Sequence, residues 1–139
     1  MDVGETMKNK IRLVIFEGAD RTGKTTAKLM FNKKTKFKHL VVDRLFFSNW
    51  IYSKSLRDVN CSEYVDLCKQ INSEVPILFV LVRRSKISSS TYKHDQFIFE
   101  LFWKDWLQMT STAGYVINND GTLKDLSRSI STMVKNLGL

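Results

Sequence analysis

Apolar and polar positions along the chain fall into alternating blocks that predict strands and helices in turn. Four short blocks have the length and composition of strands, at 11–16, 38–43, 76–82 and 113–119. Almost wholly apolar runs of this length are typical of parallel strands that are buried on both faces of a sheet. The pattern therefore favours an open parallel sheet with a helix after each strand.

Between these blocks apolar residues recur at helical spacing. Thr122 and Asp125 have the spacing of a capping box at the start of the last helix, and Ser48 is expected to cap a short helix that contains Trp50. Strands that alternate with helices predict an α/β fold, here a three-layer sandwich with a small, about four-stranded parallel sheet covered by helices. The predicted helices lie at 24–34, 48–52, 60–70, 94–109 and 122–136.

The composition fits one globular domain that spans residues 1–139, with 1–9 as a flexible N-terminal segment. Hydrophobic residues make up 43% of the 139 positions and charged residues 26%, which is enough for a packed core. No apolar run approaches the roughly 18–20 residues that span a bilayer, and the N-terminus lacks the order of a signal peptide. We therefore expect a cytoplasmic protein with no membrane partner. Cys61 and Cys68 are expected to pack on one helix face.

The charge pattern favours anionic partners. With 22 Lys and Arg against 14 Asp and Glu, the net charge is +8, which suits nucleotides, nucleic acid or a membrane surface. Four lysines gather in one short segment, and a solvated face is their ordinary explanation. Nucleic acid is possible but not favoured as a partner, because only Phe31 and Phe37 lie among these lysines. The clustered lysines are Lys33, Lys34, Lys36 and Lys38.

Residues 18–25, GADRTGKT, satisfy the phosphate-loop pattern G-x-x-x-x-G-K-[ST] between the first strand and the first helix. Gly18 and Gly23 let backbone N–H groups turn toward phosphate oxygens, and the helix adds its positive N-terminal end. Lys24 would bridge the outer phosphates, and the Thr25 hydroxyl would take one position around Mg²⁺. The loop predicts a nucleoside triphosphate and Mg²⁺ as ligands, against the alternative of a glycine turn that binds nothing. The predicted nucleotide-binding residues, which the resemblance described below makes ATP-binding, are Gly18, Thr22, Gly23, Lys24, Thr25 and Thr26.

A second acidic feature is needed, because Mg²⁺ is held by carboxylates together with water. Asp43, at the end of the second predicted strand, is the best placed, and Arg44 follows it. Taken alone, Asp43 has an ordinary explanation as a cap after a strand, and Arg44 as a surface residue. Their position favours a shared role, because adjacent parallel strands deliver the residues at their carboxyl ends to one crevice.

Two motifs resemble those of thymidylate kinases. FEGADRTGKTT at 16–26 is similar to their phosphate loop, EG-x-D-R-x-GK-[ST]-T, and DRLFFS at 43–48 is similar to their Asp-Arg pair followed four residues later by Ser. Less specific similarity extends over 10–137. The resemblance implies a P-loop NTPase fold and ATP- and Mg²⁺-dependent phosphoryl transfer to a deoxynucleoside monophosphate, with dTMP converted to dTDP. A homodimer is possible as well.

Carried over residue by residue, the resemblance implies a role for each charged residue of the two motifs. Asp20 would contact the sugar hydroxyl of the acceptor, Arg44 its monophosphate, and Asp43 would support the metal through water. Arg21 would reach the phosphoryl group in flight, so the predicted catalytic residues are Arg21, Lys24 and Asp43. An arginine suits this role, because two of its N–H groups can meet two oxygens of the transferred group. The alternative for Arg21 is a solvent-facing loop residue.

The chain also departs from the family. The stretch between the first helix and the second strand is too short for the strand and the base-reading helix that the family has there. The segment 83–95 stands where the family has its lid, and Tyr92 alone remains of the lid signature. Its basic residues could touch phosphates, stack on adenine, or form a solvated loop; they are Arg83, Arg84 and Lys86.

An aromatic cluster follows the Asp-Arg pair. Phe47 and Trp50 are the first candidates to stack on an acceptor base, with core packing as the alternative. Two other functions stay open. One is a kinase that acts on a nucleoside or on a nucleic-acid 5′ end, and the other is a non-catalytic nucleotide-binding relative that acts through a protein partner.

Overall fold

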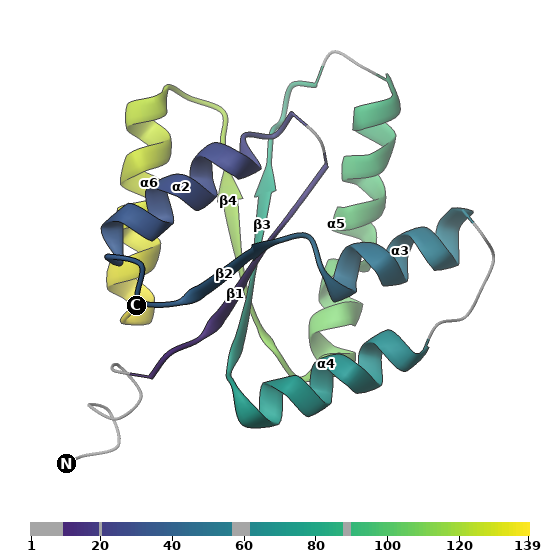
Figure 1. Cartoon of the computed structure of the whole chain (residues 1–139). Coiled ribbons are helices and arrows are strands. Elements are labelled where there is room, and N and C mark those ends of the chain that lie inside the picture. The colour runs from purple at the N-terminus through teal and green to yellow at the C-terminus, as the bar shows by residue number, and fades with distance from the viewer. Residues whose placement is uncertain (1–9, 20, 57–61, 88–89) are drawn as a thin grey trace.

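A four-stranded sheet forms the centre of the molecule (Figure 1). Its strands are β1 (Leu13–Glu17), β2 (Leu40–Asp43), β3 (Ile77–Arg83) and β4 (Ala113–Asn118). All neighbours pair in parallel, in the order β2-β1-β3-β4, so the predicted small parallel sheet of an α/β fold is confirmed. The computed structural model describes residues 10–19, 21–56, 62–87 and 90–139, and the predicted flexible segment 1–9 lies outside them.

Helices cover both faces of the sheet, which gives three layers. The helices are α2 (Lys24–Lys34), α3 (Phe46–Leu56), α4 (Ser62–Glu74), α5 (Ser90–Thr110) and α6 (Leu123–Leu137). α2 and α6 lie against one face, and α3, α4 and α5 lie against the other (Figure 1). The side chains of the central strand β1 alternate accordingly, because Val14 and Phe16 join the core under α2 and α6 while Ile15 joins the opposite one.

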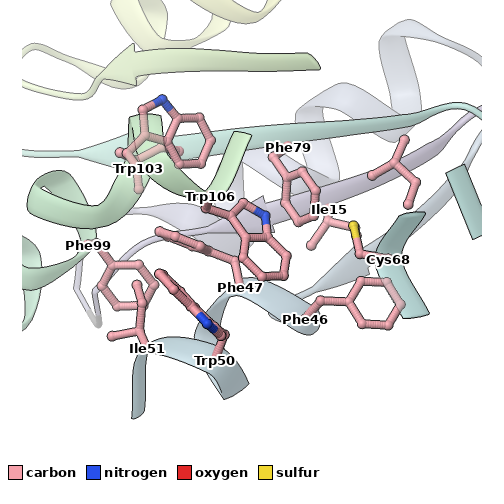
Figure 2. Close-up of a cluster of buried hydrophobic side chains, with 12 residues drawn as sticks. Ile15, Phe46, Phe47, Trp50, Ile51, Cys68, Phe79, Phe99, Trp103 and Trp106 are labelled. Atoms are coloured by element: carbon pink, nitrogen blue, oxygen red, sulfur yellow. The ribbon is translucent and has the colours of Figure 1, made fainter. Parts of the chain in front are cut away.

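The two cores differ in composition. Under α3, α4 and α5 the core is rich in aromatic rings, and the ring centroid of Phe47 lies 5.5 Å from that of Phe99 and 5.6 Å from those of Trp103 and Trp106 (Figure 2). Under α2 and α6 most of the buried side chains are aliphatic. Ring centroids at these separations are in the range in which aromatic pairs attract one another. The aromatic core therefore fixes α3 and α5 against the sheet.

Several boundaries differ from the sequence-based prediction. α3 begins at Phe46, so Ser48 is a buried residue within the helix and does not cap it. α4 and α5 are both longer than predicted. β4 is an edge strand with Val116 exposed, so uniform burial holds for the central strands and not for the edges. The capping box of α6 is confirmed, because Thr122 and Asp125 each accept a hydrogen bond from the backbone N–H of the other.

One of the two cysteines lies in the aromatic core. Cys68 is fully buried in the aromatic core, where burial raises the pKa of its thiol to about 12, so its predicted packing role is confirmed. Cys61 lies outside the described residues. None of the helices in the described part of the chain is both long enough and apolar enough to cross a membrane.

Candidate phosphate-binding site

The loop between β1 and α2 has a backbone that requires glycine at two positions. Gly18 has a φ of 142°, and a Cβ placed there would lie 2.4 Å from the backbone oxygen of Val82. Gly23 precedes α2 with a φ of 88°, and a Cβ there would lie 2.2 Å from Nδ2 of Asn119. Both separations are far below van der Waals contact. The two glycines therefore allow the loop to pack closely against the ends of β3 and β4.

Two side chains hold the loop in shape. The buried Thr22 donates from its hydroxyl to the carbonyl oxygen of Ala19 at 2.9 Å. Asn119, directly after β4, donates from Nδ2 to the carbonyl oxygen of Thr22 at 2.8 Å. Thr22, predicted to bind ATP, thus uses its hydroxyl inside the loop. Asn119 was not predicted, and its only signal in the sequence is a polar residue at the carboxyl end of an apolar strand, where ligands bind in open parallel sheets.

Lys24, the first residue of α2, points back into the loop. Its ammonium nitrogen donates to the carbonyl oxygen of Gly18 at 3.4 Å and lies 3.3 Å from Oδ1 of Asp43. Only 8% of Lys24 is exposed, and this burial lowers the pKa of its ammonium. The positive charge of Arg44 also lowers the pKa, whereas the carboxylate of Asp43 raises it. An ammonium that has lost its water is stabilised by a nearby anion. The position of Lys24 is therefore suited to a phosphate.

Asp43 and Thr25 have the chemistry of a magnesium site. Both line a cavity of about 300 Å³ above the loop. Oδ1 of Asp43 is buried, and within the described part of the chain its contact is the ion pair with Lys24 rather than a well-formed hydrogen bond. Thr25 is exposed in the first turn of α2. The Asp43 carboxylate and the exposed Thr25 hydroxyl, which line the same cavity, are oxygen groups of the kind that Mg²⁺ takes as ligands.

The two arginines of the predicted site are held differently. Arg44 donates from Nη2 to the carbonyl oxygen of Gly18 at 3.1 Å, which fixes it at the rim of the loop. Arg21 is exposed, and its guanidinium carbon lies 5.3 Å from the centre of the Tyr92 ring in α5, a separation typical of a cation–π contact. Arg21 also lines the cavity of about 300 Å³, and its contact with Tyr92 holds it against α5. Asp20, predicted to contact the acceptor, lies outside the described residues.

Glu17 is a further residue of the site that the sequence analysis missed. It is fully buried at the end of β1, and its carboxylate accepts a hydrogen bond from the backbone N–H of Leu45 at 3.1 Å and one from the Ser48 hydroxyl. Burial raises the pKa of Glu17, and the hydrogen bond from Ser48 opposes this shift. These bonds tie β1 to the start of α3 and so hold the turn that contains Arg44. Its signal in the sequence is an acidic residue that ends an apolar strand.

The structure corrects the prediction that Phe47 or Trp50 stacks on an acceptor base. Phe47 is fully buried and Trp50 is 4% exposed. Their ring centroids lie 5.6 Å and 5.5 Å from that of Trp106, inside the aromatic core (Figure 2). Neither ring has a face open to a ligand, because both rings pack against aromatic side chains of α5. Core packing, the alternative, is the role that the structure supports.

A larger cavity adjoins the phosphate loop at the carboxyl ends of β3 and β4. Arg84, which lines this cavity, has its Nη2 atom 3.9 Å from where a Cβ on Gly23 would lie. The cavity is therefore next to the phosphate loop. Among the basic residues predicted to contact a nucleotide, Arg84 and Lys86 line this cavity, whereas Arg83 pairs with Glu100 of α5. The cavity has a volume of about 550 Å³ and is lined by Arg84, Ser85, Lys86, Asn119, Asp120 and Gly121.

Comparison with known proteins does not assign the chain to a family. No protein-family model matches the chain, and no curated protein matches it. The similarity to thymidylate kinases therefore rests on the two sequence motifs. The geometry adds that the motifs meet in space, because Lys24 from the first and Asp43 from the second face the same cavity.

Proposed function

We propose that the chain is an ATP- and Mg²⁺-dependent phosphotransferase that acts on a deoxynucleoside monophosphate, with dTMP as the first candidate. The observation that carries the proposal is the position of Lys24 and Asp43, whose charged groups lie 3.3 Å apart at one cavity. A lysine for the outer phosphates at the start of the helix that follows β1, and a carboxylate for the metal at the end of the adjacent strand β2, are the groups that phosphoryl transfer from a nucleoside triphosphate requires.

The residues around the cavity would hold the donor phosphates and the metal. Lys24, the loop amides and the N-terminal end of α2 would bind the outer phosphates of ATP. Thr25 and Asp43 would hold Mg²⁺, which when bound neutralises charge on the phosphate oxygens. Arg84 lies beside the loop in the larger cavity, where its guanidinium could stack on the adenine ring. The two cavities together would accommodate one nucleoside triphosphate.

The arginines and Asp20 would act on the acceptor and on the transferred group. An oxygen of the acceptor phosphate attacks the γ-phosphorus, and the bond from that phosphorus to the β-phosphate oxygen breaks to release ADP. Arg44 would bind the acceptor phosphate, and Asp20 its sugar hydroxyl. Arg21 would leave its contact with Tyr92 and place its N–H groups on the equatorial oxygens, where negative charge needs stabilisation during transfer.

A second acceptor class is favoured by the burial of Phe47 and Trp50. With both rings in the core, neither aromatic residue predicted to read an acceptor base is available to do so. An acceptor that is recognised without its base, such as the 5′-hydroxyl end of a nucleic acid or the sugar hydroxyl of a nucleoside, fits this arrangement. A non-catalytic nucleotide-binding relative is less favoured, because nucleotide binding alone would not require Arg21.

The test is incubation of the folded chain with Mg²⁺ and γ-labelled ATP in the presence of each deoxynucleoside monophosphate, each deoxynucleoside or a 5′-hydroxyl oligonucleotide. Formation of labelled dTDP supports the first proposal, and a labelled oligonucleotide or nucleoside monophosphate supports the second. Lys24→Ala is the control that should abolish ATP binding. If the wild-type chain binds ATP in calorimetry but transfers phosphate to none of these acceptors, the phosphotransferase proposal fails and the binding role remains.

A further inference from the structure

The ends of α2 and α6 form the same hydrogen-bonded turn with different residues. In this turn, the Schellman motif, the residue just past the helix has a positive φ and is usually glycine. α6 follows the rule, because Gly138 has a φ of 64° and donates to the carbonyl oxygen of Lys135, while Leu139 donates to that of Val134. The following residue, Leu139, then packs against the aliphatic core.

α2 departs from the rule at both positions. The N–H of Lys36 donates to the carbonyl oxygen of Lys33 at 3.2 Å, and the N–H of Phe37 donates to that of Asn32 at 2.8 Å. Lys36 has a φ of 54° and Phe37 a φ of 58°, so two residues with side chains occupy the left-handed region in succession. Left-handed backbone is unfavourable for such residues because Cβ approaches the following carbonyl oxygen.

Phe37 also lacks the packing that usually accompanies this turn. The residue at its position normally makes an apolar contact with the last turn of the helix. Leu139 makes such a contact at the end of α6, whereas Phe37 is 71% exposed. Neither backbone preference nor burial therefore explains a phenylalanine here. Residues that adopt an unfavourable backbone without a folding benefit are often part of a functional surface.

Positive charge surrounds the exposed ring. Lys33, Lys34 and Lys36 are all exposed, and no Asp or Glu occurs in the sequence between Asp20 and Asp43. The last turn of α6 contributes Lys135 to the same end of the molecule. We call residues 33–38 the lysine turn.

A hydrogen bond joins His39, the residue after the lysine turn, to Leu139 just past α6. Nδ1 of His39 accepts from the backbone N–H of Arg12 at 3.0 Å, so Nε2 carries the proton and donates to the carbonyl oxygen of Leu139 at 3.3 Å. The residue that follows the lysine turn is therefore bonded to the chain just past the end of α6.

We propose that the lysine turn docks on a membrane surface that contains anionic phospholipids. The lysines would contact the headgroups, and Phe37 would enter the interfacial region, as in interfacial helices with basic and apolar residues side by side. Each lysine near such a surface strengthens binding by about fivefold. The phosphate loop lies at the opposite end of α2, roughly 16 Å away for 11 residues, so the nucleotide site stays accessible.

Single-stranded nucleic acid is the other anionic partner to consider, and it fits less well. Binding without sequence preference uses a basic groove in which several aromatic rings stack on successive bases. In this segment Phe31 is fully buried, so Phe37 alone is available. Docking on a membrane surface differs from the expectation of no membrane partner, which rested on the lack of a spanning segment. The exposure of Phe37 becomes visible only in the structure.

The test is cosedimentation of the full chain with vesicles of phosphatidylcholine alone or with about a third of phosphatidylserine. We expect binding to the anionic vesicles only, with strong weakening by salt. The double variant K33A/K34A should weaken binding by about 25-fold, and Phe37→Ser severalfold, while thermal unfolding stays cooperative. The matched control K104A/K124A removes two exposed lysines elsewhere and should weaken binding much less.

Three outcomes would overturn the proposal. One is the absence of binding to anionic vesicles by the folded chain, and another is an equal loss in the control variant, which would mean a general effect of net charge. The third is an oligonucleotide that binds more tightly than the vesicles and loses affinity in the same variants, which would make nucleic acid the partner. None of these outcomes depends on phosphotransferase activity, so this proposal can fail or hold independently of the function proposed above.

Discussion

The two ends of α2 both place residues in the left-handed region, including Arg21 with a φ of 63° before the helix, but the space around these residues differs. At the N-terminal end Gly23 has a φ of 88°, and a side chain there would collide with Asn119. At the C-terminal end Lys36 and Phe37 adopt the same region, and both side chains are exposed to solvent. The N-terminal end faces a cavity with a buried lysine, and the C-terminal end presents lysines on the surface.

This difference between the two ends shows where folding stability explains the residue in the left-handed position. Close packing of the loop against the ends of β3 and β4 requires glycine, so folding stability alone accounts for these residues. At the lysine turn, stability alone would favour glycine in place of Lys36. Gly18 and Gly23 therefore follow from the structure around them, whereas Lys36 and Phe37 need an explanation outside the molecule.

The largest effect is expected at the N-terminal end, from Arg21→Ala. If Arg21 stabilises the transferred phosphoryl group, turnover should fall by roughly 10³ while the affinity for ATP stays within a few-fold. Steady-state kinetics and calorimetry with ATP measure the two quantities separately. Lys28→Ala, which removes a positive charge from α2 itself, is the control and should leave both nearly unchanged. Equal losses in affinity and turnover would remove Arg21 from the catalytic role.

Gly23→Ala should break the packing of the loop. The left-handed backbone and the displaced Asn119 together should lower the free energy of unfolding by about 3 kcal/mol, measured by denaturant titration. Asn119→Ala alone should lower it by about 1 kcal/mol, because the carbonyl of Thr22 loses its donor. The double variant should be less destabilised than the sum, since the collision is gone. Strict additivity would show that Gly23 and Asn119 do not compete for space.

A smaller effect is expected from protonation of His39 at the C-terminal end. Burial lowers the pKa of His39, and Lys38 and Arg12 act in the same direction. The unfolded chain therefore takes up a proton more readily than the folded one. His39 contributes stability above the ordinary pKa of about 6.5 that is lost as the pH falls through the lower folded pKa.

Denaturant midpoints measured across this pH range test the prediction. The loss of stability on acidification should be smaller in His39→Gln than in the wild-type chain. His94→Gln, which removes the exposed histidine of α5, should leave the pH dependence unchanged. The same pH dependence in all three chains would show that His39 does not control it.

The smallest expected effect is a change in the free energy of unfolding that has opposite signs at Lys36 and Lys34. Lys36→Gly should raise the free energy of unfolding by up to about 1 kcal/mol, because glycine adopts the left-handed turn without strain. Lys34→Gly, two residues earlier within α2, should lower it by about 1 kcal/mol, because glycine weakens a helix. Both variants remove one lysine, so both should weaken vesicle binding to a similar degree. A destabilised Lys36→Gly would mean that folding does favour lysine in the turn.

The parts of the fold that sequence predicts well are those fixed by neighbouring residues. The apolar runs predicted β1 and β3, which lie between layers of helices. The capping box placed the start of α6 through two residues only three positions apart. The spacing of Gly18, Gly23 and Lys24 predicted a loop followed by a helix, because that backbone depends on the glycines themselves.

The parts that were predicted poorly depend on contacts between distant segments. Ser48 is a residue type that often caps helices. In the structure it lies within α3, and its hydroxyl donates a hydrogen bond to Glu17, 31 residues away. Phe47 and Trp50 could stack on a ligand or pack in the core, and the choice depends on which side of α3 meets the sheet. Spacing along a helix defines a face but does not say what covers it.

The hydrogen bond from Asn119 to Thr22 has a consequence for the order of events during synthesis. It spans 97 positions of the chain. Ribosomes add about 5–20 residues per second, so the loop is made at least roughly five seconds before the carboxamide that braces it. During that interval the emerging chain carries the motif without the finished loop. A fully braced loop is therefore a late property of the protein, which arises after β4 has been added to the sheet.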